Sequence, residues 1–324
     1  MAPAPKQPKA RRTSGPLPST SFPLRLGAID AGSNAIRFAV AEFTDPTTYR
    51  IISKMRMPIR LGHLVFTAGE LDDDTMEAAA KAFRLFRLGL EQLGAVSHRA
   101  VATSATREAS NREEFVSRIF DSSGIQLTPI SGDKEAQYVH IAVGSRLNLS
   151  KGRWILVDLG GGSVEVSLVD DTGILWSQTY PMGTVRMLET LQASAGSNET
   201  IRDWVGDRLR HLTIPPPEAY PGPTSVAATG GNIEAIARLA LSYVNPREVS
   251  RVDLDRLESV VQLLTDMTVE ERAQKLGLRP DRADVILPAA LVYQYFAQQA
   301  GAQEIVVPAV GVREGVLLEL AAEF

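Results

Sequence analysis

The sequence predicts an α/β fold made of two related lobes, each with a mixed sheet, and a cleft between them. Strand-like runs alternate with amphipathic helical patterns along most of the chain, which is typical of α/β proteins. A glycine-rich hairpin tip occurs twice in this alternation, as IDAGSN at 29–34 and as VDLGGGSVE at 157–165. Glycine leaves backbone N–H groups open to an approaching anion, so the repeated tip predicts two loops that clamp a phosphate chain.

The first lobe is predicted to open with a hairpin from Leu24 to Phe43, whose tip is the first glycine loop. Asp72 to Thr75 offer N-caps for a helix with apolar residues at helical spacing, and Gly94 closes that helix. Asn111 and Glu114 predict a capping box for the next helix. The remaining elements are strands at Tyr49–Met57, Arg99–Thr103 and Ile125–Ile130, and a helix capped by Asp133 that ends near Leu147 and passes between the lobes.

The second lobe is predicted to repeat this plan, with a buried strand at Arg153–Asp158 that leads into the triple-glycine turn. A later strand ends at Gly230 and Gly231, from which a helix continues. The other predicted elements are strands at Val164–Val169, Ile174–Tyr180, Val226–Thr229 and Glu304–Val307, helices from about Val185, at Ile233–Leu241 and at Val312–Leu320, helical stretches at Asp253–Leu276 and Arg282–Ala300, and a proline-rich loop at Pro215–Pro223.

Composition restricts the class of protein. The 324 residues are 44% hydrophobic and 22% charged, enough for a full core in one or two domains. The chain has no Cys, which excludes disulfides and thiolate metal sites and fits a reducing compartment. No apolar run approaches the roughly 18 residues of a membrane span, and the net charge of −4 disfavours generic nucleic-acid binding. We therefore expect a cytoplasmic protein whose partners include neither nucleic acid nor a membrane.

The first 23 residues differ from the rest of the chain. They contain six prolines and no acid, and their cations are Lys6, Lys9, Arg11 and Arg12. The segment lacks the apolar core of a secretory signal, and its prolines oppose an amphipathic transit helix. We predict that residues 1–23 form a disordered basic tail, with tethering to an anionic partner as the alternative.

Four charged residues near the loops are candidates for phosphate chemistry, and each has a structural alternative. Asp158 and Glu165 can flank one turn and suit Mg²⁺, which prefers one or two carboxylates; alternatively, Asp158 caps its own loop and Glu165 is solvated. Glu135 lies in a first helical turn, where it either complements the helix dipole or acts as a general base. Arg107 follows a strand end, where it either pairs phosphate oxygens or is a plain surface arginine.

Other phosphate-binding and hydrolytic motifs are excluded. A dinucleotide fingerprint must lead into a helix, whereas a strand follows the triple glycine. No G-x-x-x-x-G-K-[ST] occurs, which excludes a P-loop NTPase. Glu165 stands where a nucleophile elbow needs its second flanking glycine, so Ser163 is not predicted to be a nucleophile.

From about Leu24 to Leu320 the chain resembles the exopolyphosphatase/guanosine pentaphosphatase (Ppx/GppA) family in its short, two-domain form. That family belongs to the actin-like, sugar-kinase-like ATPase superfamily, which implies two ribonuclease H-like lobes. The resemblance also suggests a homodimer. The stretches that carry it are AIDAGSNAIRFAV at 28–40, ATSATREA at 102–109, ISGDKEAQ at 130–137, VDLGGGSVEV at 157–166, MGTVRMLE at 182–189, ATGGNIEAIA at 228–237, RADVILPA at 282–289 and GVREGVLLEL at 311–320.

The resemblance implies a role for each candidate. Glu135 matches the catalytic glutamate that activates the attacking water, and Asp158 and Glu165 match the acidic pair associated with Mg²⁺ or another divalent cation. The expected reaction is hydrolysis of a terminal phosphoanhydride with release of orthophosphate. The residues expected to bind phosphate are Gly32, Ser33, Asn34 and Arg37 in the first lobe, Gly160, Gly161, Gly162 and Ser163 in the second, and Arg107.

The resemblance also divides the chain and narrows its substrates. We expect a first lobe of residues 24–132 plus 309–324 and a second lobe of residues 133–308. Inorganic polyphosphate is the favoured substrate, and the 5′-triphosphate end of pppGpp is the alternative, with ppGpp as a further ligand. A kinase on the same scaffold and a sensor without hydrolysis stay open. Three positions depart from the family pattern: Lys134, which we expect to favour an entering polyanion, Val164 and Asn232.

Overall fold

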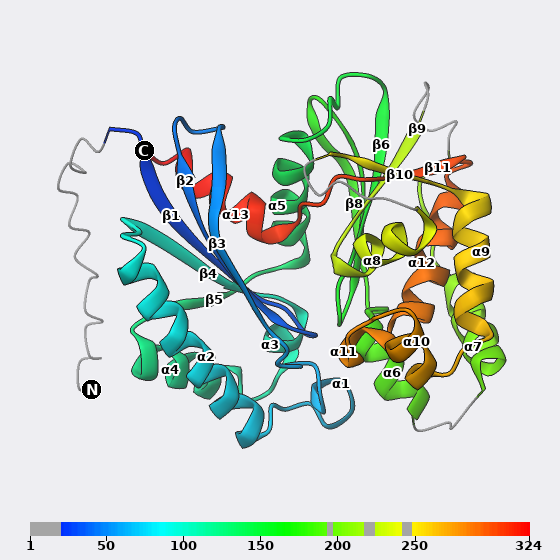
Figure 1. The fold of residues 1–324 in the computed structure, drawn as a ribbon, viewed down its shortest axis with the longest axis horizontal. Coiled ribbons are helices and arrows are strands. Elements are labelled where there is room, and N and C mark those ends of the chain that lie inside the picture. The colour runs from blue at the N-terminus through cyan, green and yellow to red at the C-terminus, as the bar shows by residue number, and fades with distance from the viewer. Residues whose placement is uncertain (1–20, 193–196, 217–223, 242–247) are drawn as a thin grey trace, which may run out of the picture.

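Two mixed sheets form the framework of the protein (Figure 1). The computed structural model describes residues 21–192, 197–216, 224–241 and 248–324. The first sheet has the order β3 (Tyr49–Met57), β2 (Ile36–Phe43), β1 (Leu24–Ala31), β4 (Ser97–Ala102) and β5 (Leu127–Pro129). The second has the order β10 (Ser250–Asp253), β11 (Glu304–Val307), β9 (Thr224–Thr229), β6 (Arg153–Leu159), β7 (Val164–Asp170) and β8 (Gly173–Tyr180).

The two sheets share a local plan. In the first, β1 pairs antiparallel with β2 and parallel with β4; in the second, β6 pairs antiparallel with β7 and parallel with β9. Each glycine loop therefore joins the two antiparallel strands at the centre of its sheet. The predicted α/β class with two mixed sheets is confirmed.

Helices cover the outer faces of both sheets (Figure 1). On the first lobe, Phe86 of α2 stacks on Phe38 of β2 with ring centroids 5.0 Å apart, and both side chains are fully buried. Such aromatic burial contributes roughly 2 kcal/mol per side chain. The helices of this lobe are α1 (Val65–Ala68), α2 (Asp73–Gln92), α3 (Ser104–Glu108) and α4 (Arg112–Ser123). Those of the second are α6 (Thr184–Gln192), α7 (Asn198–Leu209), α8 (Gly231–Ala240), α9 (Leu254–Thr265), α10 (Val269–Lys275), α11 (Pro280–Ala283) and α12 (Ile286–Gln299).

Two helices lie between the sheets, α5 (Gly132–Gly144) and α13 (Val312–Ala321) (Figure 1). They pack against each other; α5 also contacts β6, β7 and β8, whereas α13 contacts β1, β2 and β4. One apolar cluster joins them to both sheets, for example through Leu26, Val139 and Leu317. The return of α13 to the first sheet supports the predicted lobes of 24–132 plus 309–324 and 133–308, which stay a prediction.

Most predicted strands and long helices are confirmed, and two predicted caps are wrong. Asn111 precedes α4, but its side chain bonds the backbone of Leu71 at 3.0 and 2.8 Å instead of forming a capping box with Glu114. The N-cap of α5 is Ser131, whose hydroxyl accepts from the Lys134 N–H, and not Asp133.

The two long helical stretches are interrupted in the structure. Asp253 is the last residue of β10, and Thr268 caps α10 with a capping box, so 253–276 contains the end of a strand and two separate helices. Pro288 has no N–H to donate back to Asp284, which separates α11 from α12. The short helices α1 and α3 and the longer α7 were not predicted. Most of the proline-rich loop and of the N-terminal tail lies outside the described residues.

None of the helices in the described ranges combines the length and apolarity that crossing a bilayer requires.

Candidate active site

The two glycine loops touch each other between the lobes. Ser33 accepts from the Ala105 N–H at 3.2 Å and shares a hydrogen bond of 3.0 Å with the Ser104 hydroxyl, which fixes the first loop against α3. In the second loop a Cβ on Gly161 would lie 2.8 Å from Ser33 Cβ and 3.0 Å from the Asn34 nitrogen. Glycine is therefore required at 161 because any side chain there would displace the first loop.

The second loop is held by the start of α6. The N–H groups of Thr184 and Val185 donate to the carbonyls of Gly160 and Gly161 at 3.0 and 2.7 Å. Arg186 adds a bond of 2.7 Å from its Nε to the Gly162 carbonyl, and its guanidinium also bonds both carboxylate oxygens of Glu108 in the first lobe. The position of the loop is thus set from both lobes.

One cleft of about 420 Å³ contains most of the predicted site. Both loops, one acid of the predicted pair and the predicted catalytic glutamate line it together. The predicted residues on its wall are Gly32, Ser33, Asn34, Arg37, Glu135, Asp158, Gly160 and Gly161. The other predicted residues, Arg107, Gly162, Ser163 and Glu165, are not among the residues that line it.

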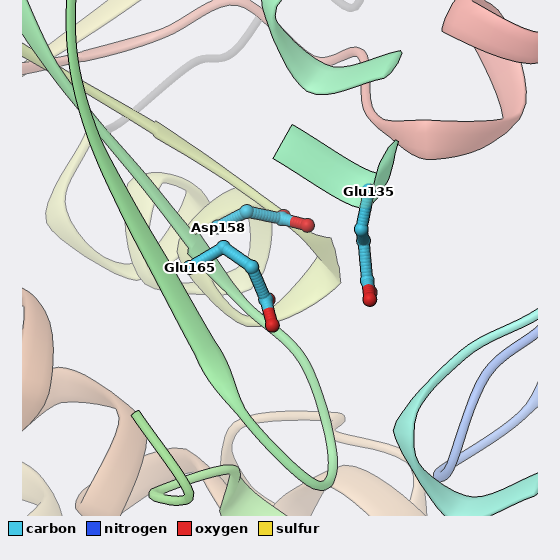
Figure 2. Close-up of side chains that lie close together, drawn as sticks. All are labelled: Glu135, Asp158 and Glu165. Carbon is cyan, nitrogen blue, oxygen red and sulfur yellow. The ribbon is translucent and has the colours of Figure 1, made fainter. Parts of the chain in front are cut away.

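Glu135, Asp158 and Glu165 form a buried cluster of carboxylates (Figure 2). One oxygen from each lies within 4.8 Å of the others, and the residues are 4%, 8% and 2% exposed. The strand register explains why Asp158 and Glu165 lie close together, because the two residues are directly opposed on β6 and β7. Figure 2 shows Glu135 reaching the same space from α5. The two acids do flank one turn, and Glu165 is not a solvated strand position.

Hydrogen bonds satisfy only part of this cluster. Thr229 donates to Asp158 at 2.6 Å, and Ser163 donates to Glu165 Oε1 at 2.6 Å. Glu135 Oε2 and Glu165 Oε2 are buried and have no hydrogen-bond partner among the described residues. Burial and the charge of Asp158 raise the pKa of Glu165 to about 8. The pKa of Glu135 is raised well above its usual range, first by burial and then by the charge of Glu165. Converging, unsatisfied carboxylate oxygens fit a hard divalent cation.

Arg107 lies beside Glu135 and not at the open surface. Its Nη1 donates to the Ile130 carbonyl at 2.8 Å and lies 3.6 Å from Glu135 Oε2. Because a charge on Arg107 favours the ionised form of Glu135, this pair opposes the effect of burial on that carboxylate.

Asn34 and Arg37 make contacts that the sequence did not reveal. Arg37 bonds Asp30 at 3.1 Å, directly across the β1–β2 pair. Asn34 donates to the Asp281 carbonyl at 3.1 Å and accepts from Arg60 at 3.0 Å, and Arg60 bonds Asp284 at 2.9 Å. The first loop is therefore tied to α11 of the second lobe.

Sequence reasoning missed most of the cations of the cleft. Its wall carries seven cations, of which only Arg37 was predicted; the others are Lys54, Arg56, Arg238, Arg279, Arg282 and Arg313. Its acids are Asp30, Glu135, Asp158 and Glu234. Arg282 and Arg313 fall in stretches that carry the resemblance, which was the available signal. Lys54, Arg56, Arg238 and Arg279 lie outside those stretches.

Arg282 is buried, and its guanidinium has no hydrogen bond or ion pair with any described residue. Burial and the nearby guanidinium groups of Arg279, Arg37 and Arg56 lower the pKa of Arg282 to about 10. A Cβ on Gly231 would lie 2.5 Å from Arg282 Nη2, so the guanidinium lies against the turn that starts α8. An unpaired buried guanidinium favours a bound anion.

The three departures from the family pattern have different surroundings. Lys134 bonds Glu319 of α13 at 2.5 Å and does not line the cleft, so the expectation that it attracts an entering polyanion has no support here. Val164 is fully buried in β7. Asn232 lines the cleft, and its Oδ1 is buried without a hydrogen-bond partner.

Comparison with known proteins agrees with this geometry. The model of the Ppx/GppA phosphatase family matches residues 39–324. A Mycobacterium tuberculosis protein named exopolyphosphatase 1 is 27% identical over 302 residues, covering 91% of this chain and 88% of that protein. Exopolyphosphatase 2 of the same species is 28% identical over 319 residues, covering 92% and 98%.

Solved structures share the fold. A crystal structure of an exopolyphosphatase from Cytophaga hutchinsonii superposes with a TM-score of 0.85 at 22% identity, covering 92% of this chain and 98% of that one. The Aquifex aeolicus member of the Ppx/GppA family gives a TM-score of 0.76 at 23% identity, covering 93% and 98%. The predicted actin-like fold is confirmed by these similarities.

Proposed function

We propose, on the premise that this chain belongs to the Ppx/GppA phosphatase family, that it is an exopolyphosphatase. The reaction is hydrolysis of the terminal phosphoanhydride of inorganic polyphosphate, with release of orthophosphate. The observation that carries the proposal is that both glycine loops, Glu135 and Asp158 line one cleft. This reaction needs donors for the phosphoryl oxygens, a base for the attacking water and a site for a divalent cation in one place.

The two loops are proposed to bind the terminal phosphates. Gly32 to Asn34 and Gly160 to Gly161 line the cleft from opposite lobes, so a phosphate between them can be bound by main chain from both sides. Gly162 and Ser163 complete the second loop from behind. Arg37 on the wall of the cleft and Arg107 beside Glu135 are proposed to supply guanidinium groups that stabilise charge on the transferred phosphoryl oxygens.

Glu135 is proposed to accept a proton from the attacking water. Its carboxylate projects from α5 into the cleft, and one of its oxygens has no hydrogen-bond partner. Burial and neighbouring acids raise its pKa, and a carboxylate with a raised pKa is a stronger proton acceptor. Arg107 at 3.6 Å limits the orientation of that carboxylate.

Asp158 and Glu165 are proposed to hold Mg²⁺ or another divalent cation. The fit rests on the unsatisfied Glu165 oxygen and on the convergence of the carboxylates within 4.8 Å. When bound, such a cation neutralises charge on the phosphoryl oxygens. Thr229 and Ser163 orient the two carboxylates through their hydrogen bonds.

The 5′-triphosphate end of pppGpp is the second candidate substrate, because it presents the same terminal anhydride. The wall of the cleft does not favour it: no Phe, Tyr or Trp is among the described residues that line it, so a guanine base has no aromatic partner there.

One assay separates these functions. Orthophosphate release is measured with tripolyphosphate, longer polyphosphate, pppGpp and ATP, each with and without Mg²⁺. We expect release from both polyphosphates that depends on Mg²⁺. A protein that frees no orthophosphate from either polyphosphate but cleaves pppGpp would overturn the proposal. ATP consumption that requires an acceptor would instead indicate a kinase.

A further inference from the structure

The first residue of α5, Gly132, lies directly against Thr179 of the edge strand β8. A Cβ on Gly132 would lie 2.2 Å from Thr179 Oγ1, 3.2 Å from Thr179 Cβ and 3.4 Å from Thr179 Cγ2. Non-bonded carbon atoms in favourable contact are roughly 3.5–4 Å apart, so the shortest of these distances is an overlap. The three nearest atoms all belong to Thr179, so one side chain limits how closely the start of α5 can approach β8.

The backbone at Gly132 does not itself require glycine. Its φ lies outside the left-handed region, so alanine can adopt the same backbone conformation. Alanine is also a better helix former than glycine. The close approach to Thr179 is therefore the feature of the structure that explains glycine at the start of α5.

Thr179 belongs to a row of polar residues that crosses the second sheet through the carboxylate cluster. Each residue of the row is directly opposed to the next, from β9 through β6 and β7 to β8, in the order Thr229, Asp158, Glu165 and Thr179. Opposed residues of antiparallel strands share one face of the sheet, with Cβ atoms roughly 5 Å apart. The contact between Gly132 and Thr179 therefore lies one strand away from Glu165.

Glu135 lies on the same face of α5 as Gly132, because residues three apart in a helix are neighbours on one face. Figure 2 shows the Glu135 side chain reaching the space beside Asp158 and Glu165. One oxygen from each of these three carboxylates lies within 4.8 Å of the others. A helix held further from β8 would therefore move the Glu135 carboxylate relative to the other two.

The segment that leads into α5 is held by the first lobe. The Ile130 N–H donates to the Ala102 carbonyl at 2.9 Å, and the Ile130 carbonyl accepts from Arg107 at 2.8 Å. Both partners belong to β4 and to the helix that follows it, α3. These bonds hold the segment to the first lobe, and the contact of Gly132 with Thr179 holds the first turn of α5 against the second sheet.

We propose that Gly132 is a positioning residue for Glu135. The missing side chain lets α5 pack directly on Thr179, and this packing sets the position of the Glu135 carboxylate relative to the attacking water. The inference rests on the proposed function, in which Glu135 accepts a proton from that water. Relief of the overlap that a methyl group would create needs a shift of about 1 Å, and a misplacement of this size can cost roughly a hundredfold in rate.

The test is the turnover of Gly132→Ala on inorganic polyphosphate with Mg²⁺. We expect kcat for orthophosphate release to fall by roughly ten- to a hundredfold with KM close to the parent value, because the glycine loops still bind the terminal phosphates. Gly144→Ala is the matched control. It makes the same substitution at the last residue of the same helix, where the added Cβ would lie 3.7 Å from Leu149 Cδ1, an ordinary contact. We expect this control to keep the parent kcat and KM.

Changes at Thr179 separate the contact from a general effect on the helix. Thr179→Ala removes Oγ1 and Cγ2 and leaves only the Cβ, 3.2 Å from the added carbon. Gly132→Ala/Thr179→Ala should therefore recover most of the lost kcat. Thr179→Val keeps a branched side chain of similar size that is stiff at χ1. Gly132→Ala/Thr179→Val should therefore stay as slow as Gly132→Ala.

A further measurement identifies the group through which Gly132 acts. Single-turnover orthophosphate release is compared between Glu135→Gln and Gly132→Ala/Glu135→Gln. Residues that act as a unit have effects that do not add. We therefore expect Gly132→Ala to cost little in the Glu135→Gln background, although it costs much in the parent.

Failure of this inference is distinguishable from failure of the proposed function. If the parent releases no orthophosphate from polyphosphate, the proposed function fails. If the parent is active and Gly132→Ala keeps its kcat, the contact with Thr179 does not position Glu135, and the proposed function stands. A loss of kcat that Thr179→Ala does not reverse, or an equal loss in the Glu135→Gln background, also overturns the positioning role.

Discussion

The two central hairpins have the same backbone plan and opposite charge patterns. In the first, Asp30 faces Arg37 across β1 and β2, and the two side chains form an ion pair at 3.1 Å. In the second, Asp158 faces Glu165 across β6 and β7. A single cross-strand position, seven residues after the aspartate in both hairpins, is therefore arginine in one lobe and glutamate in the other.

This difference indicates which of the two hairpins lacks a positive side chain to balance its acids. Burial raises the pKa of Asp30, but Arg37 opposes that rise through its charge and its hydrogen bond. Among the described residues no cation forms an ion pair with Asp158 or Glu165, and Glu135 adds a third acid to the same space. The first hairpin supplies its own counter-charge, whereas the counter-charge of the second is the divalent cation proposed above.

Of the changes that test this comparison of the two hairpins, removing the charge of Glu165 is expected to have the largest effect. We expect Glu165→Gln to lower Mg²⁺-dependent orthophosphate release from polyphosphate by roughly a thousandfold, because cation charge at a transferring phosphoryl group is worth several kcal/mol. The Mg²⁺ concentration for half-maximal rate should rise. Glu234→Gln, which removes an acid of the cleft wall outside the cluster, is the matched control and should lose far less. A Glu165→Gln variant with parent activity would show that the second hairpin holds no catalytic cation.

Glu135→Gln tests the proposed general base independently of the two hairpins. We expect polyphosphate binding to persist while turnover falls by at least roughly a hundredfold, the scale for losing a general base. Single-turnover orthophosphate release and equilibrium binding measure the two effects. Glu234→Gln removes another acid of the wall and serves as the control. Unchanged turnover in Glu135→Gln would return this residue to a role in the helix dipole.

Stability of the metal-free protein should fall as the pH rises. The pKa of Glu165 is about 8 in the folded protein, against a usual value of 4.5, so the folded state holds a proton that the unfolded state has released between these values. Denaturant unfolding in EDTA should therefore show a loss on the order of 4 kcal/mol from about pH 5 to about pH 8.5. Mg²⁺ should restore stability mainly at the higher pH, and Glu165→Gln should flatten the pH dependence. Equal pH slopes for the variant and the parent would contradict this assignment.

The smallest expected effect concerns the first hairpin. Arg37→Met leaves Asp30 buried without its partner, and we expect a loss of about 1–2 kcal/mol in the free energy of unfolding, since Arg37 is partly exposed. Arg37→Met/Asp30→Asn removes both charges and should recover much of that loss in a double-mutant cycle. Additive losses in the cycle would show that the two residues do not stabilise each other.

The sequence allowed the local features to be predicted. Runs of β-branched and aliphatic residues around a D-x-G turn predicted both hairpins, and a spacing of seven residues across a turn predicted that Asp158 and Glu165 flank it. The apolar stripe of α2 and the αL glycine after it, Gly94, were also predicted. Each of these depends on interactions between residues near in the chain. The role of each site residue stays a prediction.

Features that depend on lobe packing could not be predicted. Lys54 and Arg238 are far apart in sequence and outside any motif, and they line one cleft only because the lobes face each other. Arg60, Asn34 and Asp281 likewise meet across the lobes. The wrong cap of α5 has a local cause: Ser131 and Asp133 are both good cap residues two positions apart, and the sequence does not decide between them.

The contrast between the hairpins can be seen directly in crystals grown with Mn²⁺ in place of Mg²⁺. An anomalous difference map should contain a peak beside the carboxylates of Asp158 and Glu165 and none beside Asp30 and Arg37. A peak at the first hairpin, or none at the second with Mn²⁺ in excess, would contradict the account.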